Sequence, residues 1–292
     1  MEYQLWQCIV ALLVGLDKTP HPTGCDFSDT RIVQVYYWAV IHERPVSWAC
    51  QRRHWPVHQR RRTLPSNSTM SKRLRTPTVR TLLTEMERRV VAPREPEMFW
   101  MIDGKPLVIG GCSKDRQAGY GRAAGGKAKG YKVHAIVSSR GAIAAWRLAP
   151  MNTDERVMAE RLLKTADIQG YVVADSNYDS NPLHAVCDRR ESLQLLTRRR
   201  YGAHHGTGHR RQSAGRLRSM ARLENPSPAF AERLIQDRSE IERQFASWTN
   251  WGGGLTSLPP WVRTHRRVHR WVQAKLVLAG LKRHGSIRTY VT

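Results

Sequence analysis

Two short apolar runs that each end in an aspartate are the features of this sequence most able to do chemistry. Residues 99–103 read Phe-Trp-Met-Ile-Asp, and residues 171–175 read Tyr-Val-Val-Ala-Asp. Runs of this length are typical of buried β-strands, and ligands gather at the carboxyl ends of strands in open α/β sheets. If the two strands are neighbours, we expect the carboxylates of Asp103 and Asp175 to lie close together.

Two carboxylates at one sheet edge predict a site for divalent metal ions. Mg²⁺ is commonly held by one or two carboxylates beside water and substrate phosphates. Two such ions, roughly 3.5–4 Å apart, can activate a water or a 3′-hydroxyl and stabilise the leaving oxygen of a phosphodiester. Glu242, on a long predicted helix, can supply a third carboxylate. Arg238 lies one helical turn before it on the same face, where it can contact a phosphate or neutralise charge.

Each of these acids taken singly has a plainer interpretation, as a surface residue or half of an ion pair on a helix. Glu240 competes with Glu242 but points to a different face of the helix. Asp179 competes with Asp175, but we expect it to cap the helix that follows.

The elements that must position these acids predict an α/β domain with a mixed sheet. Residues 131–137 alternate as a strand does, and residues 142–148 can pair with them across the turn at Arg140-Gly141. A helix capped by Asn152 or Thr153 and ending near residue 166 follows, then the strand 171–175, a helix over 182–190 and a strand over 193–197. After an irregular basic stretch, Ser227-Pro228 begins a helix to about residue 248. This order matches the ribonuclease H-like arrangement.

Residues 1–95 predict a separate helical, basic region that binds DNA, followed by a catalytic domain over residues 96–292. A helix opens at Ser28 or Asp29, a turn falls at Arg44-Pro45, and a second short helix passes through residues 48–50; a loop is expected over residues 64–69 and a helix over 78–91. A basic flank follows the second helix, made of Arg52, Arg53, Arg60, Arg61 and Arg62. Helix, turn, helix and basic flank suit a DNA-binding module, and an ordinary helical subdomain with a solvated basic face fits equally well.

Two further stretches carry expectations. Residues 261–283 predict an amphipathic helix that covers the sheet, with Val268, Trp271, Val272 and Leu276 facing inward and Arg266, Arg267, Arg270 and Lys275 facing outward. The glycines of residues 119–126 complete no nucleotide-binding fingerprint. With the lysines that follow, they indicate a flexible basic loop, either beside DNA or simply on the surface.

The charge of the chain points to a polyanionic partner. Lys and Arg number 48 against 24 acids, a formal net charge of +24, and a protein that touches many phosphates gains binding energy by releasing counterions. The alternative is a merely basic soluble protein. The apolar run over residues 5–16 is shorter than the roughly 20 residues of a bilayer span, and Glu2 argues against a signal peptide. We therefore expect a cytoplasmic, nucleoid-associated protein without a membrane partner. Five scattered cysteines without a C-x-x-C pair predict reduced thiols.

Four short segments carry a more specific pattern: Ile102-Asp103-Gly104, Gly130-Tyr131-Lys132-Val133-His134, Ala-Asp-Ser-Asn-Tyr-Asp over residues 174–179, and Arg-Ser-Glu-Ile-Glu-Arg-Gln-Phe over 238–245. Together they resemble the DDE transposases of bacterial insertion sequences, in the group numbered four and its relatives. The resemblance covers roughly residues 97–283. It implies a ribonuclease H-like catalytic domain, dependence on Mg²⁺ with Mn²⁺ as a substitute, and cut-and-paste movement of an element bounded by terminal inverted repeats. It also implies a homodimer on double-stranded DNA and no small-molecule substrate.

Carried over by position, the resemblance makes Asp103, Asp175 and Glu242 the three catalytic, metal-binding acids. Arg238 becomes the arginine of the family signature Y-x2-R-x3-E-x6-K, and Lys132 and His134 join the DNA contacts. The sequence departs from the family at three positions. Ile235 stands where the signature has Tyr, Thr249 stands where it has Lys, and Asn177 replaces the usual Gly before Tyr178. The first two bear on recognition of DNA ends more than on chemistry.

Three functions compete on these grounds. The first is a transposase that cuts and joins DNA, and the second is a metal-dependent nuclease without strand transfer. The third is a DNA-binding protein whose catalytic site has decayed, which the three intact acids disfavour. Inverted repeats beside the gene would separate the first function from the second.

Overall fold

The computed structural model of the chain describes residues 2–16, 24, 26–110, 112–198, 212–250, 254–255 and 257–283. Their contacts divide the chain into two compact units. The first comprises Met1–Val91, Trp251–Leu255 and Arg266–Thr292, and the second comprises Ala92–Asn250 and Thr256–His265. None of the helices in the described residues combines the length and the apolar character needed to cross a bilayer.

The described part of the first unit is helical. Its elements are α1 (Glu2–Val14), α2 (Asp29–Ile41), α3 (Val46–Ala49), the 3-10 turns η1 (Arg52–His54) and η2 (Val57–Gln59), α4 (Asn67–Arg73), α5 (Pro77–Val91) and α10 (His265–Arg283). Ser28 caps α2 as expected, its hydroxyl accepting from the Arg31 N–H. Ser66 caps α4 in the same way. The sequence there predicted a loop, because the Ser, Thr and Asn residues after the cap are typical of loops as well as of helix starts.

An aromatic cluster forms part of the core of the first unit. The rings of Trp38 and Trp55 stack with their centroids 4.8 Å apart, and Trp6 meets both of them edge-on. Each indole N–H donates to a backbone carbonyl: Trp38 to His54, Trp55 to Ala49 and Trp6 to Gln34. Such pairs stabilise a core beyond the area that they bury, so the turns after α3 are held by side chains rather than by regular structure.

Helix α10 groups by its contacts with this unit, whereas the sequence predicted that it lies in the catalytic domain. The Arg270 guanidinium donates to the Leu74 carbonyl, and the Gln273 amide donates to Glu87. Lys275 was expected to face outward, but its side chain is fully buried and its ammonium lies 2.7 Å from the Glu43 carboxylate. Most residues of the helix are buried, Lys275 among them. Amphipathic spacing therefore predicted the wrong environment for this lysine.

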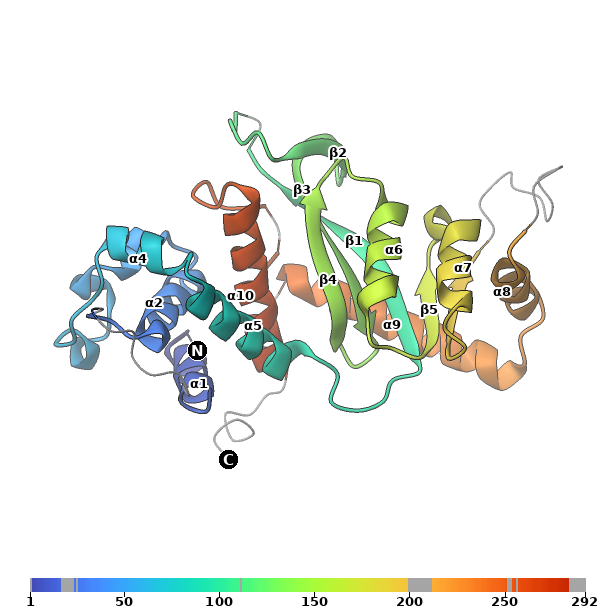
Figure 1. Ribbon diagram of the computed structural model, residues 1–292, viewed down its shortest axis with the longest axis horizontal. Helices are drawn as coiled ribbons and strands as arrows, with labels where there is room; N and C mark the ends of the chain where they lie inside the picture. Colours follow the sequence, from blue (N-terminus) through green and yellow to red (C-terminus); the bar gives the residue numbers. More distant parts are fainter. Residues whose placement is uncertain are drawn as a thin grey trace. The chain divides into compact units, whose positions relative to one another are not determined.

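The second unit is built on a six-stranded mixed sheet (Figure 1). The strands are β1 (Phe99–Val108), β2 (Gly119–Ala123), β3 (Gly126–Ser138), β4 (Ile143–Pro150), β5 (Gly170–Ala174) and β6 (Leu193–Thr197). They run in the order β2-β3-β1-β5-β6, and β4 also pairs with β3. The pairs β1–β3, β2–β3 and β3–β4 are antiparallel, whereas β1–β5 and β5–β6 are parallel. This arrangement confirms the expected mixed α/β sheet.

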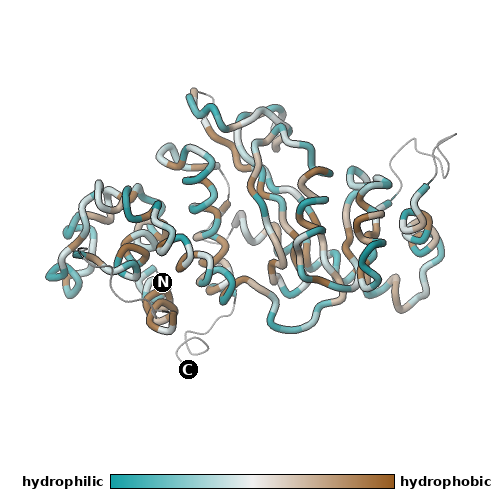
Figure 2. The backbone as a smooth tube through the Cα atoms, in the orientation of Figure 1, coloured by the Kyte–Doolittle hydropathy of each residue, from teal (hydrophilic) through white to brown (hydrophobic). Residues whose placement is uncertain are grey.

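Helices flank the sheet on both faces. The helices α6 (Glu155–Thr165) and α7 (Asn181–Asp188) cover one face, and α9 (Pro228–Asn250) lies behind the other (Figure 1). The remaining helix, α8 (Ala214–Glu224), packs against α7 and β6. Figure 2 shows apolar and polar residues alternating along α6, whose Met158, Ala159, Leu162 and Leu163 are buried.

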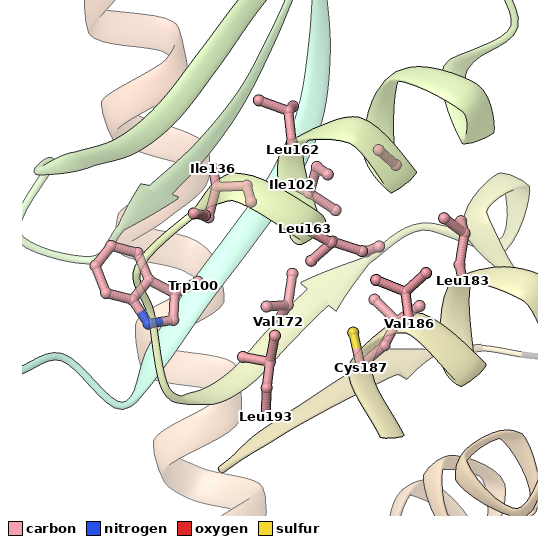
Figure 3. Close-up of a cluster of buried hydrophobic side chains, with 14 of the residues drawn as sticks. Trp100, Ile102, Ile136, Leu162, Leu163, Val172, Leu183, Val186, Cys187 and Leu193 are labelled. Carbon is pink, nitrogen blue, oxygen red and sulfur yellow. The ribbon is translucent and has the colours of Figure 1, made fainter. Parts of the chain in front are cut away.

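A hydrophobic core lies between the sheet and the α6–α7 layer (Figure 3). Trp100 and Ile102 come from β1, Val172 from β5 and Leu162 and Val186 from the helices, and all are buried. A Leu or Val side chain buried in this way stabilises a fold by about 1.5–3 kcal/mol. This core therefore fixes β1 beside β5, the two strands expected to carry the aspartates.

The structure corrects four local expectations in this unit. Strand β1 does not end at Asp103 but continues to Val108, paired with β3. Residues 119–126 form the β2–β3 hairpin rather than a flexible loop, with Gly125 and Gly126 in the positive-φ region that such a turn needs. Asp154, not its neighbours, caps α6. Helix α8, capped by Ser213, lies where the sequence indicated irregular structure.

Candidate active site

Asp103 and Asp175 lie at the same level on neighbouring parallel strands. The register of β1 and β5 pairs Phe99 with Tyr171 and Met101 with Val173. Two residues further along each strand stand Asp103 and Asp175, the second just beyond the end of β5. The structure therefore brings together the two acids that the sequence placed at the ends of buried runs.

Local hydrogen bonds orient both carboxylates. An Asp103 carboxylate oxygen accepts from the Gly104 N–H at 2.7 Å. An Asp175 oxygen accepts from the Asn177 N–H at 2.8 Å and so begins the 3-10 turn η3 (Ser176–Tyr178). Asn177 thus takes part in a turn that positions Asp175. Both acids are exposed, so solvent and a large substrate can reach them.

The carboxylates of Asp175 and Glu155 lie near Asp103, and their combined negative charge favours a bound cation. Although Asp103 as a whole residue is exposed, protein atoms surround part of its carboxyl, and this partial desolvation raises the pKa of Asp103. The Asp175 and Glu155 carboxylates raise it further. The Gly104 N–H and the Lys132 ammonium oppose this rise. Carboxylate oxygens are the ligands that Mg²⁺ prefers, one or two for each ion. The residues present therefore fit a divalent cation, which would relieve the repulsion between the acids.

Glu155 is the acid that the sequence did not single out. It occupies the first turn of α6 and forms an ion pair with Lys132 on β3. The Lys132 side chain passes Gly104 closely, since a Cβ on Gly104 would stand 2.8 Å from Lys132 Cδ. No sequence pattern indicated this role for Glu155, because only the fold shows that α6 starts next to β3.

Two buried polar side chains on this part of the sheet lack partners among the described residues. The Tyr178 hydroxyl has none, and burial together with the charges of Glu155, Asp103 and Asp175 raises the Tyr178 pKa far above its usual range. Neither ring nitrogen of His134 has a partner, and burial lowers the His134 pKa to about 4. His134 was expected to contact DNA, but its side chain is 1% exposed. It lies inside the sheet layer because it pairs with Gly104 on the central strand.

Glu242 stands apart from the aspartates in this structure. It lies on α9 with 56% of its side chain exposed, in an ion pair with Arg238 at 2.9 Å. Its neighbour Ile241 is fully buried, and α9 packs on β1 and β3. Among the described residues no three His, Cys, Asp or Glu side chains are grouped as a metal site. Arg238 and Glu242 therefore share a helix face as expected, but the structure does not bring Glu242 to the aspartates.

Asp179 does not cap the following helix, because Ser180 occupies that position. Instead its carboxylate receives two hydrogen bonds from the Arg216 guanidinium, at 2.7 and 2.8 Å. His184 lies 3.7 Å from the same carboxylate. This buried pair ties the segment after Asp175 to α8, and sequence spacing could not show it because the partners are far apart in the chain.

The arginines expected to bind DNA lie on and after the 3-10 turns of the first unit. Arg52, Arg53 and Arg61 are exposed, as is Arg60, whose guanidinium also donates to the Trp55 carbonyl at 3.0 Å. The second helix of the expected helix-turn-helix is α3, which has only four residues. The basic flank is thus presented by turns rather than by a recognition helix.

The remaining departures from the family signature are placed only in part. Ile235, at the tyrosine position of the signature, is 68% exposed on α9. The side chain of Thr249 and residue Cys25 lie outside the described residues. Of the other four cysteines, Cys8 and Cys187 are buried, Cys50 is half-buried and Cys112 is exposed.

Comparison with known proteins adds three findings. A family model described as the transposase DDE domain matches residues 96–277. Comparison with curated proteins gives no match. Among solved structures, the chain is similar to one described as the cryo-EM structure of the piggyBac transposase synaptic complex with hairpin DNA. The two share 9% sequence identity with a TM-score of 0.48, over 99% of this chain and 78% of that one.

Proposed function

Because the chain belongs to the transposase DDE domain family, we propose that it is the transposase of an insertion sequence. In this proposal it binds the terminal inverted repeats of its element, cleaves the DNA there and joins the freed 3′ end to target DNA. The observation that carries the proposal is the placing of Asp103 and Asp175 side by side on parallel strands. The sheet would then be of the ribonuclease H-like type, in which the central strand supplies the first acid.

Asp103 and Asp175 would hold the divalent metal ions, Mg²⁺ or Mn²⁺ in its place. When bound, such ions supply a Lewis acid that activates the attacking oxygen and stabilises the leaving oxygen. The carboxylates of Asp103 and Asp175 would hold such ions at this edge of the sheet, and the positive charge there would offset the repulsion between the carboxylates and the scissile phosphodiester. We propose Glu242 as the third acid, which requires its carboxylate to leave Arg238 and approach the aspartates. Arg238 is then released to contact a phosphate.

The basic surface of the first unit would bind the element's double-stranded DNA. Arg52, Arg53, Arg60 and Arg61 are all exposed there, and the whole chain carries a formal charge of +24. Charge of this size gives binding that weakens steeply with salt. Two element ends must be held at once, so we propose a homodimer on DNA, acting in the cytoplasm at the nucleoid.

The experiment that tests this function is metal-dependent cleavage of a labelled duplex carrying the DNA that flanks the gene. Native protein should cut at a defined position with Mg²⁺ and not with a chelator. Asp103→Asn and Asp175→Asn should abolish cutting but keep DNA binding, because asparagine can still accept the backbone hydrogen bonds made by these aspartates. Loss of binding together with cutting would contradict the assignment of these acids to chemistry.

Glu242 has a matched control two residues away on the same helix. Glu240→Gln should cut like the native protein, whereas Glu242→Gln should not, if Glu242 is the third acid. Equal activity in both variants would remove Glu242 from the site. Cleavage without any joined product would favour a nuclease over a transposase.

A further inference from the structure

An open hollow of about 570 Å³ adjoins the strand that carries Asp103. Its walls are Gly104 of β1, the tip of the β2–β3 hairpin with Arg122, Lys132 of β3 and Glu155 of α6. Figure 1 shows this hairpin and α6 at neighbouring parts of the sheet. Gly104 directly follows Asp103 on β1, so the hollow adjoins the strand segment that carries the acid, and the two residues face opposite sides of the sheet.

The charged side chains of the hollow leave one cation uncompensated. Lys132 is paired with Glu155, but Arg122 is exposed, and among the described residues no acid pairs with it. The hollow therefore favours an anion, which would lie close to the segment of β1 that carries Asp103, because Gly104 lines the hollow.

The hairpin tip leaves room for a ligand to approach the backbone. Gly125 and Gly126 have φ values of +88° and +119°, and a Cβ on either would meet no atom within 4 Å. At Gly104 a side chain is excluded by contact, since a Cβ there would clash with the Lys132 side chain. The wall thus combines a cation with exposed backbone, the combination with which proteins hold phosphate groups.

On the basis of the proposed function, we propose that this hollow binds a sugar–phosphate segment of the DNA strand beside the scissile position. Arg122 contacts a phosphate directly, whereas Lys132 is buried and paired with Glu155 and lines the hollow without donating to the phosphate. The volume falls in the range of about 300–1,000 Å³ typical of small-ligand sites, enough for a nucleotide-sized part of a longer strand. The β2–β3 hairpin would then guide the strand toward Asp103 and Asp175.

The test is the salt dependence of DNA binding by the full chain, measured by fluorescence anisotropy on the flanking duplex with a chelator present. Arg122→Gln should lower the slope of log affinity against log salt by about 0.9, the loss of one phosphate contact. The ratio of the native affinity for DNA to the affinity of the variant should then fall about 3.5-fold between 50 and 200 mM salt. Arg189→Gln is the control, because Arg189 is an exposed arginine directly after α7 in the same unit. It should keep the native slope.

A second measurement locates the contacted phosphate. A set of duplexes is made, each with one uncharged methylphosphonate linkage at a different position along the strand. At one position near the cleavage site, this linkage should lower the affinity of the native protein. The same linkage should not lower the affinity of Arg122→Gln any further. Additive losses at every position would overturn the proposal. Ala124→Glu, which places an acid at the exposed hairpin tip, should weaken binding more than Arg122→Gln does, and native affinity in that variant would also overturn it.

The outcomes separate this inference from the proposed function. Native protein without salt-dependent DNA binding would contradict the function itself. Normal native binding with an unchanged slope in Arg122→Gln would contradict only the hollow. Deoxyadenosine monophosphate serves as the free-nucleotide probe: if it raised the melting temperature of native protein but not of Arg122→Gln, and the DNA slope were unchanged, the hollow would bind a nucleotide rather than a strand.

Discussion

The buried Asp179–Arg216 pair should be a main determinant of the stability of the second unit. The side chains of Asp179 and Arg216 are 3% and 5% exposed, and the guanidinium donates two hydrogen bonds to the carboxylate. A further N–H of Arg216 donates to Gln212. Bidentate pairs of this kind are among the stronger hydrogen bonds in proteins. Asp179→Asn keeps the shape of the side chain but leaves the guanidinium without its counter-charge.

The cost of that change can be estimated from the burial of the pair. Removing one partner of a buried ion pair destabilises a protein by about 3–5 kcal/mol, because the remaining charge stays desolvated. For domains of about 150–250 residues, each kcal/mol shifts the melting temperature by about 2–4 °C. Asp179→Asn should therefore lower the melting temperature by about 6–20 °C. Replacing both partners by apolar side chains, as in Asp179→Leu with Arg216→Met, should recover much of the loss.

Calorimetry of the native protein and the variants measures this directly. The control is Glu85→Gln, which removes an exposed pair with Arg88 and should change stability by less than about 1 kcal/mol. A melting temperature of Asp179→Asn within that control's range would show that the buried pair contributes little to stability. A double variant no more stable than the single one would show that the cost lies in lost packing rather than in an unpaired charge.

Three other perturbations have defined outcomes. Lys275→Met should keep or raise the melting temperature. Glu43→Ala should lower the stability by about 1–3 kcal/mol, because the buried Lys275 ammonium loses its acceptor. Equal melting temperatures of the two variants by circular dichroism would contradict this. Burial raises the pKa of Asp115, but hydrogen bonds to its carboxylate outweigh this effect and lower the pKa. Asp115 therefore stabilises the fold fully above about pH 3.9, the ordinary pKa of an aspartate. That stability is lost as the pH falls through the lowered value. Urea unfolding should therefore separate native protein from Asp115→Asn at pH 7 and bring them closer at pH 3, and an equal gap at both would contradict it. Gly170→Ala should cost at least about 1–3 kcal/mol, since φ is +89° and the new Cβ would stand 2.3 Å from the Met98 carbonyl oxygen; native stability in urea would show that this turn relaxes freely.

The sequence predicted the pairing of Asp103 with Asp175 because burial imposes a local signature. A strand buried on both faces must be apolar throughout, so its first charged residue marks where it meets solvent. The same signal overlooked the rest of β1, since all residues from Gly104 to Val108 except Leu107 are only partly buried. A pattern based on burial finds where an apolar run stops, which need not be where the strand stops.

Contacts between distant segments were beyond reach of the sequence. The pairing of Lys132 with Glu155 depends on where α6 begins relative to β3, and the burial of Lys275 depends on which unit α10 joins. Helical spacing gives the faces of a helix but not their neighbours. Arg238 and Glu242 were predicted to share a face because four residues make one turn, and the same spacing could not show how far Glu242 lies from the aspartates.

Strand transfer by Asp175→Asn is the decisive assay for the role of the paired aspartates. Labelled element ends are incubated with target plasmid, protein and Mg²⁺, and covalently joined product is counted. Native protein should join ends to target, and Asp175→Asn should bind the same ends and join none. Joining by the variant at the native rate would show that the paired aspartates of β1 and β5 are not the site of the chemistry.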